Sequence, residues 1–328
     1  MLKIIFMGTP DFAKESLQAI KEQGHHILAV VTNPDRPKGR GMKQIASPVK
    51  QYATEQNLPV YQPEKIKGNE AFIAQMEQLK PDVICVVAYG KILPKELLNI
   101  ATLGCINVHG SLLPNYRGAA PIQWSVINGD KITGVTTMYM DVGMDTGDMI
   151  LKKEVTIGEE ETTGELWERL SKIGATLLVQ TLELIEQGKA PRQKQPENYT
   201  LAPMLQKEMA RIDWENSNAI AIKNLVRGLN PMMGAYSMLQ GKKIKFWKVN
   251  VISNQKLLDL FPDLAEYAYK LQDIAEGTVL FSGDRNGLYI KAKDAIIEVV
   301  EIQGENGRKM NIYDFLRGNK VEIGDMFE

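Results

Sequence analysis

The stretch CINVHGSLLPNYRGAAPIQWSVINGD, residues 105–130, predicts a strand, a loop and a helix in one unbroken run. Its first five residues are mostly apolar, as in a buried strand, and residues 120–130 have the spacing of a helix. Asn107 and His109 lie two positions apart, so they point to the same face of that strand. A carboxamide and an imidazole therefore stand together where an apolar strand ends.

The same alternation of strand and helix runs through the first half of the chain. Short apolar runs predict strands at residues 2–8, 26–32, 82–90, 104–110 and 133–140. Helical spacing occurs at residues 10–24, 47–56, 69–80 and 120–130. We expect Thr9 to cap the first helix, with Pro10 at its first position. This alternation is typical of an α/β fold, and it predicts a Rossmann-like, mostly parallel sheet with helices on both faces.

The second half of the chain changes character after a long helix predicted at residues 162–187. Residues 190–208 are rich in proline and polar side chains, which indicates a linker. Short strands separated by glycine-rich turns then favour a small, OB-like β-barrel. We predict one domain at residues 1–189 and a second at residues 209–328, with an insertion of unknown role near residues 253–275.

The composition is that of a globular protein without a membrane segment. Hydrophobic residues make up 44% of the 328 residues, charged residues make up 24%, and no apolar run could span a bilayer. Cys85 and Cys105 both lie in strand-like runs, which favours two buried thiols in a cytoplasmic protein. The formal net charge is −1, so nucleic-acid binding would need local basic patches.

Few side chains of this sequence could carry proton transfer. Among the three histidines, only His109 follows the carboxyl end of a predicted strand, where open parallel sheets bind ligands. A later glycine-rich loop supplies Asp141, Asp145 and Asp148, and the pattern alone does not choose among them. An imidazole, a carboxylate and a carboxamide together can move a proton and stabilise a developing oxyanion.

Several other chemistries lack their motifs in this chain. The turn in IIFMGTPDFA, residues 4–13, does not have the G-x-G-x-x-G spacing of dinucleotide sites. A phosphate-binding loop and a G-x-S-x-G nucleophile turn are also missing. One isolated histidine without a cysteine pair argues against a metal site. Acyl transfer would then be direct, from a donor that already carries an activated acyl group.

Four segments of the sequence resemble the folate-dependent formyltransferases, and most closely the branch of that family that acts on methionyl-tRNA. They are INVHGSLLPNYRGAAPIQWSVINGD (106–130), TGVTTMYMDVGMDTGDMI (133–150), VVAYGKILP (86–94) and PDRPKGRG (34–41). The resemblance implies 10-formyltetrahydrofolate as donor and initiator methionyl-tRNA as acceptor. It also implies catalytic roles for Asn107, His109 and Asp145, the first two at the oxyanion and the third as the partner of His109.

The resemblance further implies a folate site. Residues matching the family's folate contacts are Ser111, Leu112, Leu113, Pro114, Ile92, Leu93, Asp141 and Val142.

Two basic regions would contact tRNA if the resemblance holds. Arg36, Lys38, Arg40 and Lys43 lie in a long loop, and Arg40 matches the position that we expect to matter most. Lys243, Lys245, Lys248 and Arg308 lie in the predicted barrel, two of them next to Phe246 or Trp247. Taken alone, either region could instead be a solvated surface.

Several alternatives stay open from the sequence. The acceptor could be an amino sugar nucleotide or a glycinamide nucleotide, because the catalytic residues would be the same. Water could replace the amine, which would make the protein a formyl-folate hydrolase. A non-enzymatic RNA-binding module would leave Asn107 and His109 without a role. We expect a cytoplasmic monomer that needs no metal.

Overall fold

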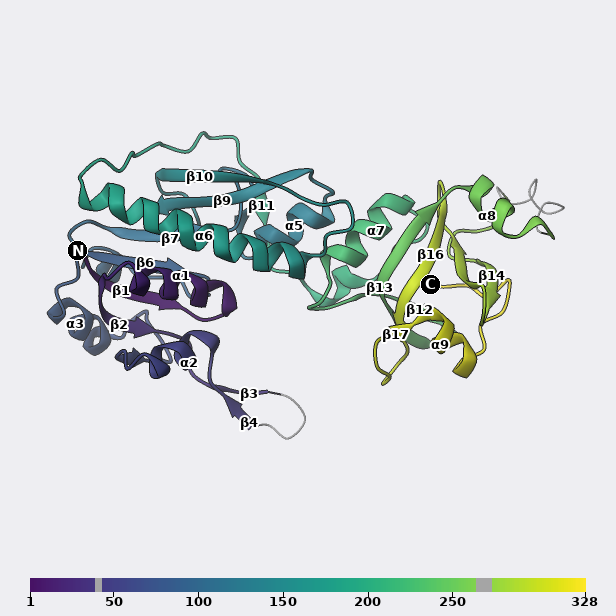
Figure 1. The fold of residues 1–328 in the computed structure, drawn as a ribbon, viewed down its shortest axis with the longest axis horizontal. Coiled ribbons are helices and arrows are strands. Elements are labelled where there is room, and N and C mark those ends of the chain that lie inside the picture. Colours follow the sequence, from purple (N-terminus) through teal and green to yellow (C-terminus); the bar gives the residue numbers. More distant parts are fainter. Residues whose placement is uncertain (39–42, 264–272) are drawn as a thin grey trace. The chain divides into compact units, whose positions relative to one another are not determined.

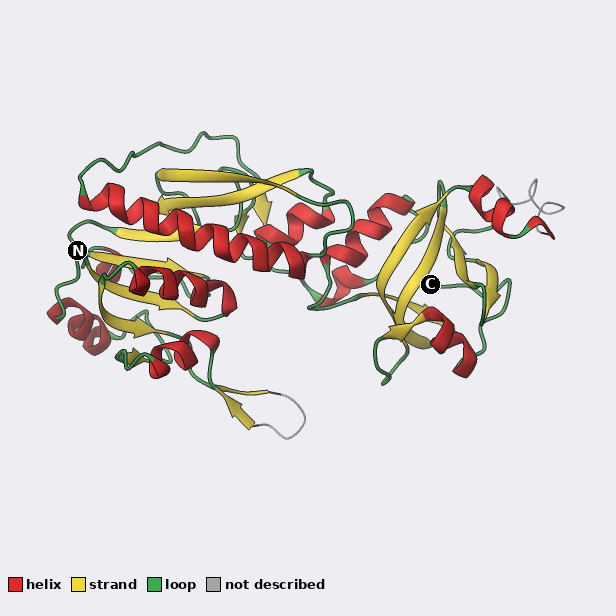
Figure 2. Ribbon diagram, in the orientation of Figure 1, coloured by secondary structure: helices red, strands yellow, loops and turns green. Residues whose placement is uncertain are grey.

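The computed structural model describes residues 1–38, 43–263 and 273–328 (Figure 1, Figure 2). The chain forms two compact units, and each unit contains segments that are separate in sequence. Unit 1 comprises residues 1–122, 132–156 and 165–204, and unit 2 comprises residues 123–131, 157–164 and 205–328. The domain boundaries expected from the sequence, at residues 189 and 209, stay a prediction.

Unit 1 is built around one mixed sheet. Its strands are β1 (Lys3–Gly8), β2 (His26–Val31), β5 (Val60–Tyr61), β6 (Val83–Val87), β7 (Cys105–His109), β9 (Ile132–Tyr139) and β10 (Met149–Thr156). Their order is β10–β9–β7–β6–β1–β2–β5. The strands from β5 to β7 are parallel, whereas β9 and β10 are antiparallel to their neighbours. The prediction of a Rossmann-like, mostly parallel sheet is confirmed.

Helices cover both faces of this sheet. The helices of unit 1 include α1 (Asp11–Glu22), α2 (Pro48–Glu55), α3 (Glu70–Gln78) and α4 (Lys95–Leu98), and α6 (Thr163–Glu186) also runs along the sheet (Figure 1). The rings of Phe12 in α1 and Trp167 in α6 meet edge to face at 5.1 Å, so these two helices share a face. Residues of α3 and α4 pack on the other face, in one apolar cluster with β1, β2, β6 and Cys105 of β7. None of the helices in the described part of the chain is both long and apolar enough to cross a bilayer.

The first helix begins one residue later than predicted. Pro10, not Thr9, holds the cap position of α1, and no side chain caps it. The Oγ1 atom of Thr9 instead accepts a hydrogen bond from Nδ2 of Asn33, at 3.1 Å. The prediction of a Thr9 cap was wrong because that hydroxyl bonds instead to Asn33, in the loop that follows β2.

Strand β10 and two short strand pairs were not predicted. The outer residues of β10, Lys152 to Glu154, are exposed, so this edge strand lacks the apolar run that marks a buried one. The basic loop contains an antiparallel pair, β3 (Arg36–Lys38) with β4 (Lys43–Ile45). Likewise β8 (Arg117–Gly118) pairs in parallel with β11 (Leu201–Ala202), within unit 1.

Unit 2 is a small antiparallel barrel. Its elements include η1 (Lys207–Ala210), α7 (Ala219–Gly228), β12 (Ala235–Leu239), β13 (Lys242–Ile252), α8 (Asn254–Leu260), β14 (Val279–Gly283), β15 (Gly287–Lys291), β16 (Ile296–Gln303), β17 (Met310–Asn311) and α9 (Ile312–Gly318); α5 (Pro121–Ile127) precedes them in the chain. The sheet order is β12–β13–β16–β15–β14, with β17 beside β16. Phe327 pairs with Leu239 at the β12 edge, and Met326 pairs with Thr278 beside β14. Residues 325–328 thus close the sheet between its two edge strands.

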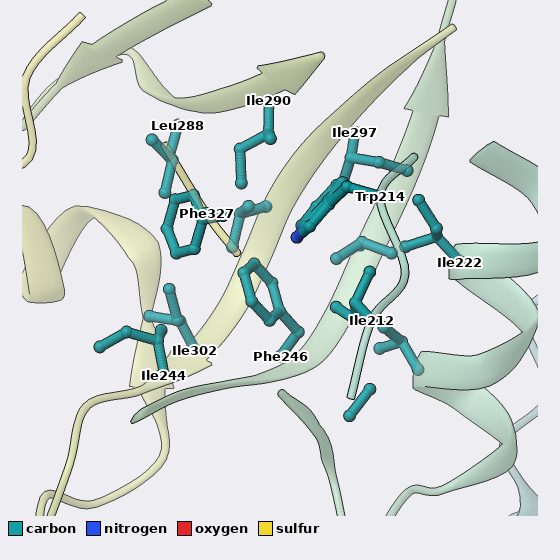
Figure 3. Close-up of a cluster of buried hydrophobic side chains, with 14 of the residues drawn as sticks. Ile212, Trp214, Ile222, Ile244, Phe246, Leu288, Ile290, Ile297, Ile302 and Phe327 are labelled. Atoms are coloured by element: carbon teal, nitrogen blue, oxygen red, sulfur yellow. The ribbon is translucent and has the colours of Figure 1, made fainter. Parts of the chain in front are cut away.

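Aromatic side chains fill the centre of this barrel (Figure 3). The ring of Phe246, from β13, lies 6.0 Å from that of Trp214 and 5.4 Å from that of Phe327. All three side chains are almost fully buried, and Ile222 of α7 belongs to the same cluster. The barrel therefore has its own apolar core, as an independent structural unit requires.

Candidate active site

The candidate site lies at the carboxyl ends of the parallel strands of unit 1. Gly8 of β1 lies opposite Val87 of β6, which lies opposite Val108 of β7. Strands β2 and β5 lie on one side of the β1–β6 pair, and β7 lies on the other, so the strand order reverses at this pair. Open α/β sheets bind ligands at the carboxyl ends of the strands beside such a reversal. His109 is the last residue of β7, and the sheet itself therefore places the imidazole at this edge.

His109 has a partner on each side of its ring. The residue is only 5% exposed. Its Nε2 atom lies 2.9 Å from the carbonyl oxygen of Tyr116, and its Nδ1 atom lies 3.6 Å from Oδ2 of Asp145. A carbonyl oxygen can only accept, so Nε2 carries the hydrogen in this contact. Nδ1 is therefore the ring atom that can gain or release a proton, and it faces a carboxylate.

Asp145 is the aspartate that the structure brings to His109. Its Oδ2 atom accepts a hydrogen bond from the backbone N–H of Gly118, at 2.8 Å. Its Oδ1 atom lies 3.5 Å from Nδ2 of Asn107, which donates to it. The three predicted catalytic side chains, from β7 and from the loop between β9 and β10, thus meet at one point.

The two other aspartates of that loop have different partners. A carboxylate oxygen of Asp148 lies 3.8 Å from the guanidinium of Arg192. Asp141 accepts a hydrogen bond from the N–H of Val142, at 2.7 Å. Of the three aspartates, Asp145 is therefore the one that contacts His109.

A cavity of about 550 Å³ opens on unit 1 at the start of β7, the opposite end of that strand from His109. Residues that line it include Cys105, Tyr139, Met140, Asp141, Val142 and Arg192. Cys105 shares a face of β7 with Asn107, and Asp141 and Val142 belong to the loop that also carries Asp145. Burial raises the pKa of the Cys105 thiol far above its ordinary value, so this side chain lines the cavity as a neutral group.

The other predicted folate contacts lie in two loops. Ile92 is 82% exposed, whereas Leu93 is buried in the core against α4. The Ser111 hydroxyl donates to the carbonyl oxygen of Asn115 at 2.6 Å, so it supports its own loop. Leu113 is buried.

The segment 111–114 is also held from β9 and β10. Thr136 donates its hydroxyl to the carbonyl oxygen of Ser111, at 2.7 Å, and accepts the N–H of Leu113, at 3.1 Å. Lys152 donates to the carbonyl oxygen of Leu113, and the partial desolvation of its ammonium group there lowers the pKa of that group. Leu112 and Pro114 are half-buried. The backbone of this loop is therefore fixed, as a site that recognises a ligand by its main chain would need.

The basic loop of unit 1 is anchored at its base. The carboxylate of Asp35 accepts from the ammonium of Lys50 at 2.5 Å and from Nε2 of Gln62 at 2.8 Å. These hydrogen bonds hold the pKa of Asp35 below its ordinary value. Arg36 is exposed at the start of β3. In the same loop, Lys38 and Lys43 pair through their backbones in the β3–β4 ladder, and Arg40 lies outside the residues that the structure describes.

The basic residues of unit 2 lie on the outer face of β13 and in the β16–β17 turn. Ile244 and Phe246 point inward, so Lys243 and Lys245 point outward. The ammonium of Lys243 lies 3.7 Å from the ring centre of Tyr236, and that of Lys245 lies 5.6 Å from the ring centre of Trp247.

Irregular pairing after Phe246 lets Trp247 and Lys248 both face outward before Val249 returns to the core. Lys248 lies opposite Glu301 of β16, and Arg308 is exposed. Cations and aromatic rings are thus combined on this face, and Glu301 lies among them.

Several residues around His109 were not identified from the sequence. Tyr116 supplies the carbonyl that meets His109, and Arg117 donates from Nε to Oε1 of Gln195, at 2.9 Å. Gln195 and Thr200 belong to the segment predicted as a linker. Because Gln195 and Thr200 bond mainly to backbone atoms of distant loops, no motif in the sequence marked them.

Metal ligands do not cluster in the described ranges of the chain. No group of three or more His, Cys, Asp or Glu side chains there could hold an ion.

Comparison with known proteins decides the family. The model described as "Formyl transferase" matches residues 2–182, and that described as "Formyl transferase, C-terminal domain" matches residues 204–320. A methionyl-tRNA formyltransferase of Clostridioides difficile is 48% identical over 324 residues, which cover 98% of this chain and 99% of that protein. This chain belongs to the methionyl-tRNA formyltransferase family. A member from Caldanaerobacter subterraneus subsp. tengcongensis is 44% identical over 328 residues, covering 100% of both chains.

Solved structures of other proteins share the fold. An N-formyltransferase from Helicobacter canadensis, in complex with folinic acid and dTDP-3-aminofucose, has a TM-score of 0.65 at 18% identity, over 91% of this chain and 99% of that one. HypX from Aquifex aeolicus, in complex with tetrahydrofolic acid, has a TM-score of 0.63 at 16% identity, over 98% of this chain and 50% of that one. The predictions of the fold class and of a formyl-transferring enzyme are confirmed, and the roles of single residues stay predictions.

Proposed function

We propose that this protein transfers the formyl group of 10-formyltetrahydrofolate to the free amine of initiator methionyl-tRNA. The main support for the proposal is that Asn107 and His109 both contact Asp145, in a chain that is 48% identical to a methionyl-tRNA formyltransferase. The protein would act in translation initiation, in the cytoplasm, as a monomer without a metal.

The reaction we infer is direct attack of the amine on the formyl carbon. The carbonyl oxygen becomes an oxyanion, which Asn107 stabilises through its N–H groups, and His109 through Nδ1 once that atom has taken up the proton that the amine releases. The amine nitrogen loses one proton as its bond to carbon forms. When the carbon–N10 bond breaks, that folate nitrogen takes up a proton, and His109 is placed to carry it. Asp145 keeps the imidazolium oriented and charged during this exchange.

The folate would lie beside the catalytic group. Asp141 and Val142 lie in the same loop as Asp145, and they and the backbone of residues 111–114 would contact the donor. The exposed side chains of Ile92 and Val142 supply apolar surface for a flat ring. Binding there places the formyl carbon within reach of Asn107 and His109 before the amine arrives.

The tRNA would be held by charge at two places. In unit 1 these are the basic loop residues Arg36, Lys38, Arg40 and Lys43; in unit 2 they are Lys243, Lys245, Lys248 and Arg308. Residues 1–189 would then carry the chemistry, and residues 209–328 would bind the backbone of the acceptor, with residues 190–208 joining them. Contacts to phosphates give affinity with little sequence preference, so the acceptor's amine must be selected at the catalytic site.

A transfer assay with three readouts tests this proposal. Purified protein is mixed with 10-formyltetrahydrofolate and either methionyl-tRNA or an amino sugar nucleotide, and free formate is measured in both reactions. Formylmethionyl-tRNA as the main product is the expected result. Transfer to the sugar alone, or formate alone, would overturn the assignment of the acceptor.

A further inference from the structure

Residues 193–202, which we call the strap, contact both loops that hold His109. At one end, the backbone of Gln193 exchanges two hydrogen bonds with that of Met149, at 2.8 and 3.0 Å. At the other end, β11 pairs with β8. The sequence predicts a linker at residues 190–208, and the structure pairs residues of the strap with unit 1 at both of its ends.

Gln195 holds the loop that carries Asp145. Its Nε2 atom donates to the carbonyl oxygens of Asp145, at 2.7 Å, and Gly147, at 2.8 Å. Its Oε1 atom accepts from Nε of Arg117, whose guanidinium is buried and lies 4.3 Å from the ring centre of Tyr199. Both hydrogens and the oxygen of this carboxamide are therefore used on the loops around His109.

Thr200 holds the opposite loop in the same way. Its hydroxyl oxygen accepts the N–H of Tyr116, at 2.9 Å, and its carbonyl oxygen accepts the N–H of Arg117, also at 2.9 Å. Tyr116 in turn presents its carbonyl oxygen to Nε2 of His109. The strap thus bonds to both residues that flank the imidazole: to Asp145 through Gln195 and to Tyr116 through Thr200.

Both neighbours have a backbone conformation that needs support. The φ angle of Asp145 is +52° and that of Tyr116 is +60°, in the left-handed region that side chains other than glycine rarely adopt. Such conformations persist only where the surroundings hold them, and they are common where catalytic groups are preorganised. Gln195 bonds the carbonyl of the first residue, and Thr200 bonds the N–H of the second.

We propose that Gln195 and Thr200 are positioning residues for formyl transfer, which keep Asp145 and Tyr116 on either side of the His109 ring. This inference rests on the proposed function. The hydrogen bonds of the strap described above go to Asp145, Gly147, Met149 and residues 116–118, and not to the predicted folate contacts Asp141 and Val142 or to the residues proposed to bind tRNA. Its loss should therefore lower kcat and leave the KM of both substrates nearly unchanged.

The first test replaces Gln195→Met, which keeps the length of the side chain and removes its hydrogen bonds. Gln193→Met is the matched control, because Gln193 is exposed and belongs to the same strap. We expect kcat of Gln195→Met to fall roughly 10- to 100-fold, with both KM values within about twofold of wild type. The control should match wild type. A normal kcat, or a loss confined to KM, would overturn the inference for Gln195.

A rescue series tests the second contact independently. Thr200→Val keeps the shape of the side chain without the hydroxyl, whereas Thr200→Ser keeps the hydroxyl. We expect roughly a tenfold lower kcat for the valine variant and near-normal turnover for the serine variant. Equal activity of the two variants would remove Thr200 from the positioning role, even if Gln195→Met cannot be purified in folded form.

A double-mutant cycle shows whether Gln195 acts through Asp145. In an Asp145→Asn background, Gln195→Met should change kcat by less than about threefold, because the partner that it positions is already impaired. Fully multiplicative losses would contradict the inference. Wild-type protein serves as the reference: if it forms no formylmethionyl-tRNA the proposed function fails, and if it is active while Gln195→Met and Thr200→Val match it, only the strap inference fails.

Discussion

The carboxyl end of β7 and the outer face of β13 are both polar surfaces proposed to meet the substrates, yet they are built differently. His109 is 5% exposed, and defined protein groups at 2.9 and 3.6 Å face its two ring nitrogens. On β13, Lys243 and Lys248 are exposed, and Lys243 stands over an aromatic ring.

The difference reflects what each surface would do. Proton transfer requires reacting atoms at fixed distances, so a small displacement costs much of the rate. Attraction of an RNA backbone depends on total charge and tolerates movement of any single cation. We therefore expect single substitutions to have large effects at β7 and small, additive effects at β13.

The largest effect is expected at His109. His109→Ala should lower the rate of formyl transfer roughly 10²- to 10⁴-fold, because the group that exchanges the proton is gone. Single-turnover formylation of methionyl-tRNA measures the rate, and titration with folate measures donor binding, which should persist. His26→Ala, at an exposed histidine on β2, is the control. Turnover near that of the wild type would take His109 out of the reaction.

A moderate effect is expected on the barrel. In the double variant Lys248→Ala with Arg308→Ala, the KM for tRNA should rise several-fold while kcat stays unchanged. The slope of log affinity against log salt should become shallower by roughly 0.7 to 0.9 for each phosphate that the variant no longer neutralises. The variant with Lys248→Arg and Arg308→Lys preserves both charges and should keep the wild-type slope. An unchanged slope in the alanine variant would mean that this face does not bind RNA.

The smallest effect is expected at the base of the basic loop. Hydrogen bonds from Lys50 and Gln62 lower the pKa of Asp35 in the folded protein, so its contribution to stability is present above the pKa of the unfolded chain. That contribution disappears as the pH falls through the lower, folded pKa.

Urea unfolding of Asp35→Asn measures this contribution. At pH 7 the variant should be less stable by at most about 1 kcal/mol, as is usual for partly exposed ion pairs. The difference from wild type should shrink as the pH falls below the ordinary aspartate pKa of about 3.9. A difference of the same size at pH 7 and at pH 3 would assign the effect to something other than the charge.

Which parts of the fold and of the candidate site could be predicted from the sequence depended on the kind of interaction that holds each part. The parallel strands were identifiable because strands buried on both faces are continuous apolar runs. The shared face of Asn107 and His109 followed from strand geometry, and the family resemblance singled out Asp145. The strap was missed because Gln195 and Thr200 bind backbone atoms of distant loops, which leaves no periodic pattern in the chain. Strand β10 was missed because its polar, exposed edge resembles a loop.

The closure of the barrel by residues 325–328 has a consequence for synthesis of the chain. Strands β12 and β14 are made before the segment that pairs beside them, so their edges stay open until translation has passed residue 325. Open strand edges are templates for pairing with other chains. A chain released shortly before this point would leave both strand edges exposed, and such incomplete chains should aggregate far more readily than the finished protein.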